Sequence, residues 1–232
     1  MERILSSVLV LGAWMLYPST VAGQPPSGPT TRNLLADMQS YAQALGVTCE
    51  YCHVAPANSG LPQPKKDIAR TMIAMTRDVN IQVQLATGKA PVEVTRVECA
   101  TCHRGVAIPK PLGQIIAETV QYKGADAAIA QYRDLRNRYY GRGSYDFGED
   151  ELVKVARPLA SVRPDDTITL MQLNIEFNPR SARSYALIGF AYTRKFDDES
   201  AMTNVQKAVD LEPENGEFQG QLAQLKMFQR KR

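Results

Sequence analysis

The sequence predicts a mainly α-helical protein built in two parts. Apolar residues recur at helical spacing in both halves of the chain, which indicates amphipathic helices. The first part contains the sequence Cys-x-x-Cys-His twice. The second part, from Leu112 onward, repeats a pattern of paired helices.

The two Cys-x-x-Cys-His motifs are typical of attachment sites for c-type haem. Two thiols three positions apart can add to the two vinyl groups of one haem, and the following histidine becomes the proximal iron ligand. The chain has four cysteines and two histidines, and the two motifs use all of them. The sequence therefore predicts two covalently attached haem c groups. Their expected attachment and proximal residues are Cys49, Cys52 and His53, and Cys99, Cys102 and His103.

Two other chemistries use similar cysteine spacings. A pair of C-x-x-C motifs can close a tetrahedral zinc site with four thiolates. A single C-x-x-C can be a thioredoxin-like redox motif, which requires a βαβ pattern around it. Neither explains a histidine directly after both cysteine pairs in a chain with only two histidines, so the spacing favours haem.

The N-terminus predicts export. Arg3 lies in a short polar start, residues 4–16 are almost entirely apolar, and small residues follow at 19–23. We interpret residues 1–23 as a signal peptide and 24–30 as a linker. The alternative is an uncleaved signal anchor that tethers the protein to the membrane, although the apolar run is short for a membrane span. Both interpretations place the body of the protein in the periplasm, where bacterial c-type cytochromes acquire haem.

We expect a small multihaem cytochrome domain at residues 31–110, with a helix before each motif. The first helical stripe covers residues 34–45 and stops at Gly46. The second covers 66–85, and alternating valines over 92–97 then predict a short extended stretch. The net charge of +3, offset by haem propionates, gives no indication of nucleic-acid binding.

Methionine is the expected distal ligand, because no histidine remains for a sixth position and His/Met ligation is common in c-type cytochromes. The candidates are Met38, Met72 and Met75, which all lie on the helices before the motifs. Met38 is predicted for the first haem, whereas spacing alone leaves Met72 and Met75 open for the second. The alternative for each is core packing, the commoner role of methionine on a helix.

Three stretches resemble the cytochrome subunit of photosynthetic reaction centres. They are LGVTCEYCH at 45–53, KKDIARTMIAMTRDVN at 65–80 and VECATCHRG at 97–105. The resemblance covers about residues 31–110 and implies Met38 as the first distal ligand. For the second haem it implies the methionine directly after Ala-Arg-x, which is Met72, with Met75 as the runner-up.

The chain also departs from that family. Members at reaction centres carry more haems, one of them with two histidine ligands, and many have a lipid-attachment cysteine. This chain has two motifs and no spare histidine. The resemblance therefore implies a haem unit for electron transfer, with a reaction centre or a respiratory complex as the redox partner.

Residues 111–232 resemble tetratricopeptide-like repeats, which are pairs of antiparallel helices. The clearest copy covers 182–215, and weaker copies begin at Leu112 and Leu152. Residues 216–230 are predicted to form a capping helix. Such repeats usually present a groove to a protein, so we expect peptide or protein docking there by analogy with the fold.

Together these features favour an exported one-electron carrier in a photosynthetic or respiratory chain, and not an enzyme. Two alternatives stay open. One is a dihaem peroxidase-type enzyme with one open iron site. The lack of a distal histidine counts against it. The other is a repeat-based interaction protein in which the haems are structural.

Overall fold

The computed structural model describes residues 31–54 and 62–230. The predicted signal peptide at 1–23 and the linker at 24–30 lie outside these residues. The chain divides into two compact units, residues 1–37 and 38–232. Both haem motifs and all the repeat helices lie in the second unit, and the predicted domain boundary at residue 110 remains a prediction.

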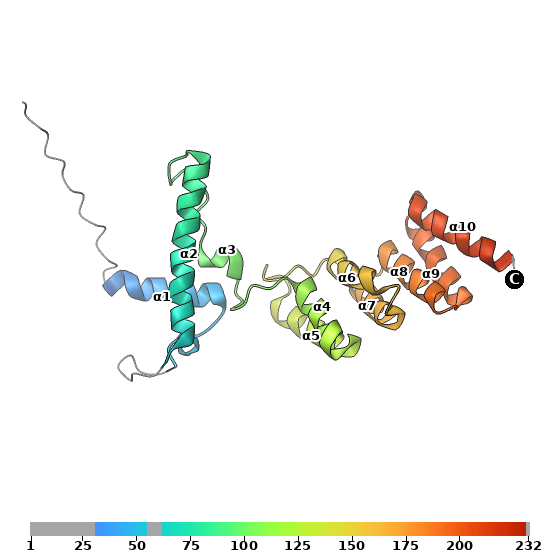
Figure 1. The fold of residues 1–232 in the computed structure, drawn as a ribbon, viewed down its shortest axis with the longest axis horizontal. Coiled ribbons are helices and arrows are strands. Elements are labelled where there is room, and N and C mark those ends of the chain that lie inside the picture. Colours follow the sequence, from blue (N-terminus) through green and yellow to red (C-terminus); the bar gives the residue numbers. More distant parts are fainter. Residues whose placement is uncertain (1–30, 55–61, 231–232) are drawn as a thin grey trace, which may run out of the picture. The chain divides into compact units, whose positions relative to one another are not determined.

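The described residues form helices joined by turns and include no strand, which confirms the mainly α prediction (Figure 1). None of these helices is long and apolar enough to cross a membrane. The helices are α1 (Thr31–Leu45), α2 (Pro64–Thr87), α3 (Cys99–His103), α4 (Leu112–Lys123), α5 (Ala125–Tyr139), α6 (Glu149–Ala156), α7 (Pro164–Phe177), α8 (Ala182–Arg194), α9 (Asp198–Leu211) and α10 (Gly216–Arg230), with short 3-10 turns η1 (Cys49–Tyr51) and η2 (Arg157–Leu159).

The helix before each haem motif ends at a glycine in the left-handed region. Gly46 has a φ of 65° and Gly88 has a φ of 63°. After α1, the Gly46 N–H donates to the carbonyl of Gln43 at 3.1 Å, and the Val47 N–H donates to that of Ala42 at 3.0 Å. This is the Schellman arrangement, which needs a residue without a Cβ penalty at Gly46. The predicted stop at Gly46 is confirmed.

The prediction of an extended stretch over residues 92–97 is wrong. Residues 91–93 form a turn, in which the Glu93 N–H donates to the carbonyl of Ala90 at 2.9 Å. Instead of a neighbouring strand, the side chain of Asn80 on α2 pairs with both backbone groups of Val97. Its amide nitrogen donates to the Val97 carbonyl and its oxygen accepts from the Val97 N–H, each at 2.8 Å. One side chain thus replaces the hydrogen bonds of a sheet.

The hydrophobic core lies in the repeat helices. α4 to α8 share the largest buried cluster, and two smaller clusters continue it through α9 and α10. α8 crosses α9 at Gly189, where an added Cβ would lie 2.4 Å from the Val205 side chain and 3.0 Å from the Ala201 carbonyl. Only a glycine permits this approach, as expected for small residues at a helix crossing.

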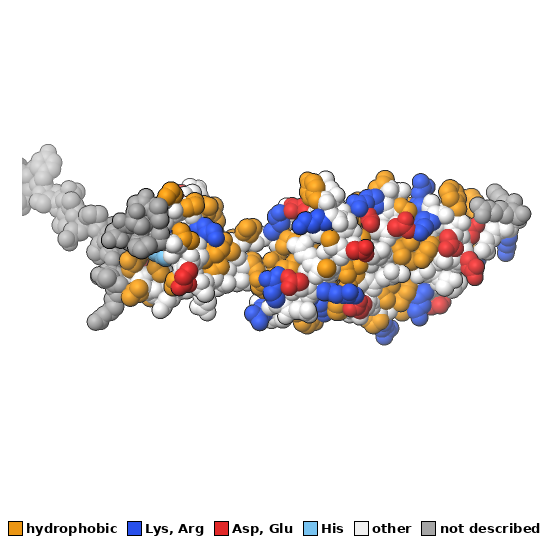
Figure 2. Space-filling view, turned by 90° about the horizontal axis from the view of Figure 1, so that it is seen from below, with side chains coloured by type: hydrophobic (Ala, Val, Ile, Leu, Met, Phe, Trp, Pro, Cys, Tyr) orange, Lys and Arg blue, Asp and Glu red, His pale blue; other side chains and the backbone are white. Residues whose placement is uncertain are grey.

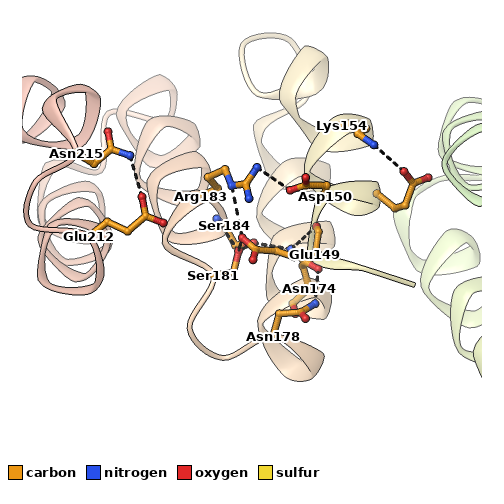
Figure 3. Close-up of polar contacts among 11 residues, drawn as sticks. Glu149, Asp150, Lys154, Asn174, Asn178, Ser181, Arg183, Ser184, Glu212 and Asn215 are labelled. Atoms are coloured by element: carbon orange, nitrogen blue, oxygen red, sulfur yellow. Dashed lines mark hydrogen bonds and ion pairs between the residues drawn. The ribbon is translucent and has the colours of Figure 1, made fainter. Parts of the chain in front are cut away.

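A buried polar network joins the start of α6 to α7 and α8 (Figure 3). Asn174, Ser181 and Ser184 are fully buried. The Asn174 amide donates to the Ser184 hydroxyl at 2.8 Å and to the backbone carbonyl of Glu149 at 3.1 Å. The Ser181 hydroxyl donates to the Glu149 carboxylate at 2.7 Å. Three consecutive helices therefore share one set of paired polar groups.

Candidate functional site

Each haem motif folds as a single helical turn. The first cysteine pair spans η1, and the second lies in α3. Residues three apart in a helical turn lie on the same side of it. Cys49 therefore shares a side with Cys52, and Cys99 with Cys102, and all four thiols are free. Two adjacent thiols on one turn are the arrangement that attachment to a single haem requires.

His103 is held in a state suited to metal binding. Its side chain is 9% exposed, and its Nδ1 lies 3.0 Å from the carbonyl oxygen of Val106. A carbonyl can only accept, so Nδ1 carries the proton and Nε2 keeps its lone pair for a metal. The His53 ring, in contrast, is exposed. The second motif is therefore the more preorganised of the two.

The turn that carries His103 is fixed at both ends. Glu98 and Thr101 form a reciprocal capping box at the start of α3, with the Glu98 N–H donating to the Thr101 hydroxyl at 3.0 Å. At the other end, Arg104 and Gly105 adopt φ values of 49° and 83°. These two left-handed residues reverse the chain, which brings the Val106 carbonyl to the imidazole.

The end of α1 packs directly on the loop that follows the second motif. The Gly105 N–H donates to the carbonyl of Ala44 at 2.8 Å. An added Cβ on Gly46 would lie 2.1 Å from the Gly105 carbonyl oxygen. The backbone before the first motif thus touches the backbone after the second, and the Ser144 hydroxyl donates to the Arg104 carbonyl at 2.6 Å from the far side.

The three candidate methionines occupy different surroundings. Met38 on α1 is 39% exposed and Met75 on α2 is 45% exposed, whereas Met72 is half-buried. Met72 belongs to a half-buried stripe of α2 that also contains Asn80, the residue bonded to Val97 just before the second motif. Met75 lies outside this stripe. The placement agrees with Met72 as the distal residue of the second site.

The donor set and its surroundings fit a haem. Between residues 38 and 110, the only buried side chains among the described residues are Ala44, His103 and Val106, and α2 buries none of its 24 residues. Figure 2 shows patches of apolar side chains and few charged ones over the described part of this region, whereas charges are interspersed with apolar side chains over the helices that follow. The large apolar side chains exposed there are Met38, Val54, Ile68, Met75, Val79, Ile81, Leu85, Val92 and Ile108. A porphyrin needs such apolar contacts as well as the thiols and the imidazole.

The zinc alternative finds no support in the side-chain arrangement. Within the described part of the chain, no three His, Cys, Asp or Glu side chains converge on one point. Burial raises the pKa of the Cys99 thiol, so it stays protonated near neutral pH. A hydrogen bond from Thr48 lowers the pKa of Glu50, which keeps a negative charge beside the first motif.

Several residues of the site were missed by the sequence analysis. Asn80 gives no signal in the apolar periodicity, because its role is to bond a backbone 17 residues away. Val106 acts through its backbone carbonyl, which any residue could supply. Ser144 acts through a hydroxyl that lies 40 residues along the chain from Arg104, its partner. Lys65 has no assigned role in the sequence analysis, but its ammonium lies 3.6 Å from the centre of the Tyr51 ring.

Asn80→Ala is expected to destabilise the protein by about 1–2 kcal/mol, because the partly buried Val97 backbone groups lose both partners. Urea unfolding followed by helical circular dichroism measures this change. Gln82→Ala, an exposed change on the same helix, is the control and should leave the unfolding midpoint almost unchanged. Equal effects of the two variants would contradict the role assigned to Asn80.

Comparison with known proteins shows what part of the chain is similar to. Residues 31–142 match the family described as photosynthetic reaction centre cytochrome C subunit. This part of the chain is similar to the reaction-centre cytochrome subunit family. A stretch of 95 residues is also 38% identical to cytochrome c-554 of Chloroflexus aurantiacus, covering 39% of this chain and 22% of that protein. The chain thus matches only about a fifth of the length of that relative.

This relationship confirms the resemblance predicted from the motifs. The names of the matched family and of this relative support a c-type cytochrome unit within the matched part of the chain. The matched residues extend to 142, beyond the predicted end at 110. They therefore include α4 and α5, which the sequence analysis assigned to the repeats.

Proposed function

We propose that this cytochrome is exported to the periplasm, where it carries single electrons through two haem c groups in a photosynthetic or respiratory chain. Cys49 and Cys52 would attach the first haem, with His53 and Met38 as axial ligands. The second site is made up of Cys99, Cys102, His103 and Met72. Each haem supplies an iron that alternates between the ferrous and ferric states.

The observation that carries this proposal is the hydrogen bond between His103 Nδ1 and the Val106 carbonyl. It selects the tautomer in which Nε2 can bind iron, and it makes the imidazole a stronger electron donor. The half-buried thioether of Met72 supplies the matching soft ligand on α2. A histidine and a methionine together fill both axial positions and give a higher reduction potential than two histidines.

The remaining residues hold these ligands in place. The contact between Gly46 and Gly105 ties the first attachment turn to the second, which would keep the spacing of the two sites constant as electrons pass. The helices from α4 to α10 would form the repeat region that docks a protein partner. If His53 with Met38 and His103 with Met72 bind the irons as proposed, no open iron position would remain for peroxidase chemistry.

Met38→Ala and Met72→Ala are each expected to convert one haem from low spin to high spin, because each removes the sixth ligand. Electron paramagnetic resonance of the oxidised protein, together with carbon monoxide binding to the reduced protein, measures this. Met75→Ala is the matched control and should stay fully low spin. Each of the first two variants should gain one carbon monoxide site, whereas the unaltered protein should have none.

Three outcomes would overturn parts of the proposal. If Met75→Ala becomes high spin and Met72→Ala does not, the second distal ligand is Met75. A carbon monoxide adduct on the unaltered protein would show an open iron and would favour the peroxidase-type alternative. A reductive titration that finds no reversible uptake of electrons would favour the structural-haem alternative.

A further inference from the structure

A cleft of about 540 Å³ lies beside the loop that follows the second haem motif. We propose that this cleft is the docking site for an acidic surface on the redox partner of the protein. The proposal rests on the electron-carrier function proposed above. One wall of the cleft is the loop at Arg104 and Gly105. The other is the end of α5 with the turn that follows it, and includes Arg138, Arg142 and Ser144.

The lining of the cleft is cationic. Arg104, Arg138 and Arg142 line it, and no acidic side chain does so among the described residues. Arg138 pairs with Asp134 but leaves 55% of its side chain exposed. Arg142 is exposed and forms no ion pair with any described residue. The guanidinium group of Arg142 is therefore free to bind an external anion, and that of Arg138 remains accessible.

The position of the cleft suits electron transfer. Arg104 directly follows His103, the predicted iron ligand. The hydrogen bond from Ser144 to the Arg104 carbonyl, 2.6 Å long, fixes the opposite wall to the same loop. Gly46, which precedes the first motif, also lines the cleft. A partner seated here would lie next to the backbone that joins the two haem sites.

A lining of arginine side chains is suited to binding carboxylate groups. Arginine binds a carboxylate through two parallel hydrogen bonds. Several arginines around one opening also attract an acidic surface over a distance and orient it before contact, an effect that salt weakens. An acidic protein surface meets three arginines at once, which a single small anion does not.

A gold electrode coated with a carboxylate-terminated alkanethiol monolayer serves as the acidic probe. The holoprotein is adsorbed on it, and cyclic voltammetry measures the interfacial electron-transfer rate at low salt. Arg138→Gln/Arg142→Gln is expected to lower this rate about three- to tenfold, as for the loss of two exposed charge pairs. The matched control is Arg157→Gln/Arg180→Gln, which removes two exposed arginines elsewhere and should keep most of the rate.

The outcomes separate this proposal from the one on which it rests. No current from the unaltered protein would contradict the electron-carrier function itself. Normal current with equal rates for the two double variants would overturn the docking site alone. If Arg138→Gln/Arg142→Gln instead shifts the solution reduction potential of one haem and keeps the rate on the monolayer, the arginines serve haem propionates and the docking site is also overturned.

Discussion

Gly46→Ala is expected to destabilise the protein by about 3–4 kcal/mol. Part of the cost is the left-handed backbone at Gly46, which disfavours any residue with a Cβ by about 1 kcal/mol. The larger part is the clash, since the new Cβ would lie 2.1 Å from the Gly105 carbonyl oxygen, a backbone atom that cannot rotate away. Urea unfolding of the holoprotein, followed by haem absorbance and circular dichroism, measures the loss.

Gly88→Ala separates these two contributions. Gly88 also ends a helix, and its φ of 63° is close to the 65° of Gly46. An added Cβ at Gly88 meets nothing within 4 Å. Gly88→Ala should therefore cost only about 1 kcal/mol. Similar losses for the two variants would mean that the Gly46–Gly105 contact does not contribute to stability.

Asn174→Ala is expected to cost about 2–3 kcal/mol, because it removes the centre of the buried network beneath α6, α7 and α8. The fully buried Ser184 hydroxyl and the half-buried backbone carbonyl of Glu149 would each lose the Asn174 amide as a donor. Differential scanning calorimetry measures the fall in melting temperature. The haem spectrum should stay unchanged, since the network belongs to the repeat helices.

Asn204→Ala is the control for that experiment. The Asn204 amide donates only to the carbonyl of Ser200 within its own helix, at 2.8 Å, and its side chain is half-buried. The same chemical change should therefore cost well under half as much. A fall in melting temperature as large as that of Asn174→Ala would show that the network adds nothing beyond a local hydrogen bond.

The helices of this protein were predictable because their signals are local. Apolar periodicity and the glycines at 46, 88 and 124 predict where helices run and stop, and the structure confirms these positions. The alternating valines over 92–97 misled for the same reason. Alternation describes only the order of side chains along the sequence. A strand also requires a neighbouring strand to pair with its backbone, and here the Asn80 side chain pairs with the Val97 backbone instead.

The candidate site was predictable in its reactive residues and not in its supporting contacts. Spacing alone identified the cysteines and histidines, because haem attachment requires side chains at fixed separations. It left Met72 and Met75 open, since both lie on apolar positions of one helix. Met72 is half-buried on the same side of α2 as Asn80, whereas Met75 is exposed, and the assignment of Met72 as the ligand stays a prediction.

The contact between the end of α1 and Gly105 also bears on how the protein is made. Ala44 precedes the first haem motif and Gly105 follows the second, so their hydrogen bond closes a long loop that contains both motifs. Closing a loop of this length costs chain entropy. The contact that offsets this cost can form only when the whole segment is present. A chain emerging through a membrane from its N-terminus would present the first motif well before this closure. Haem attachment would then proceed on an open segment, and the closure would lock the two sites together afterwards.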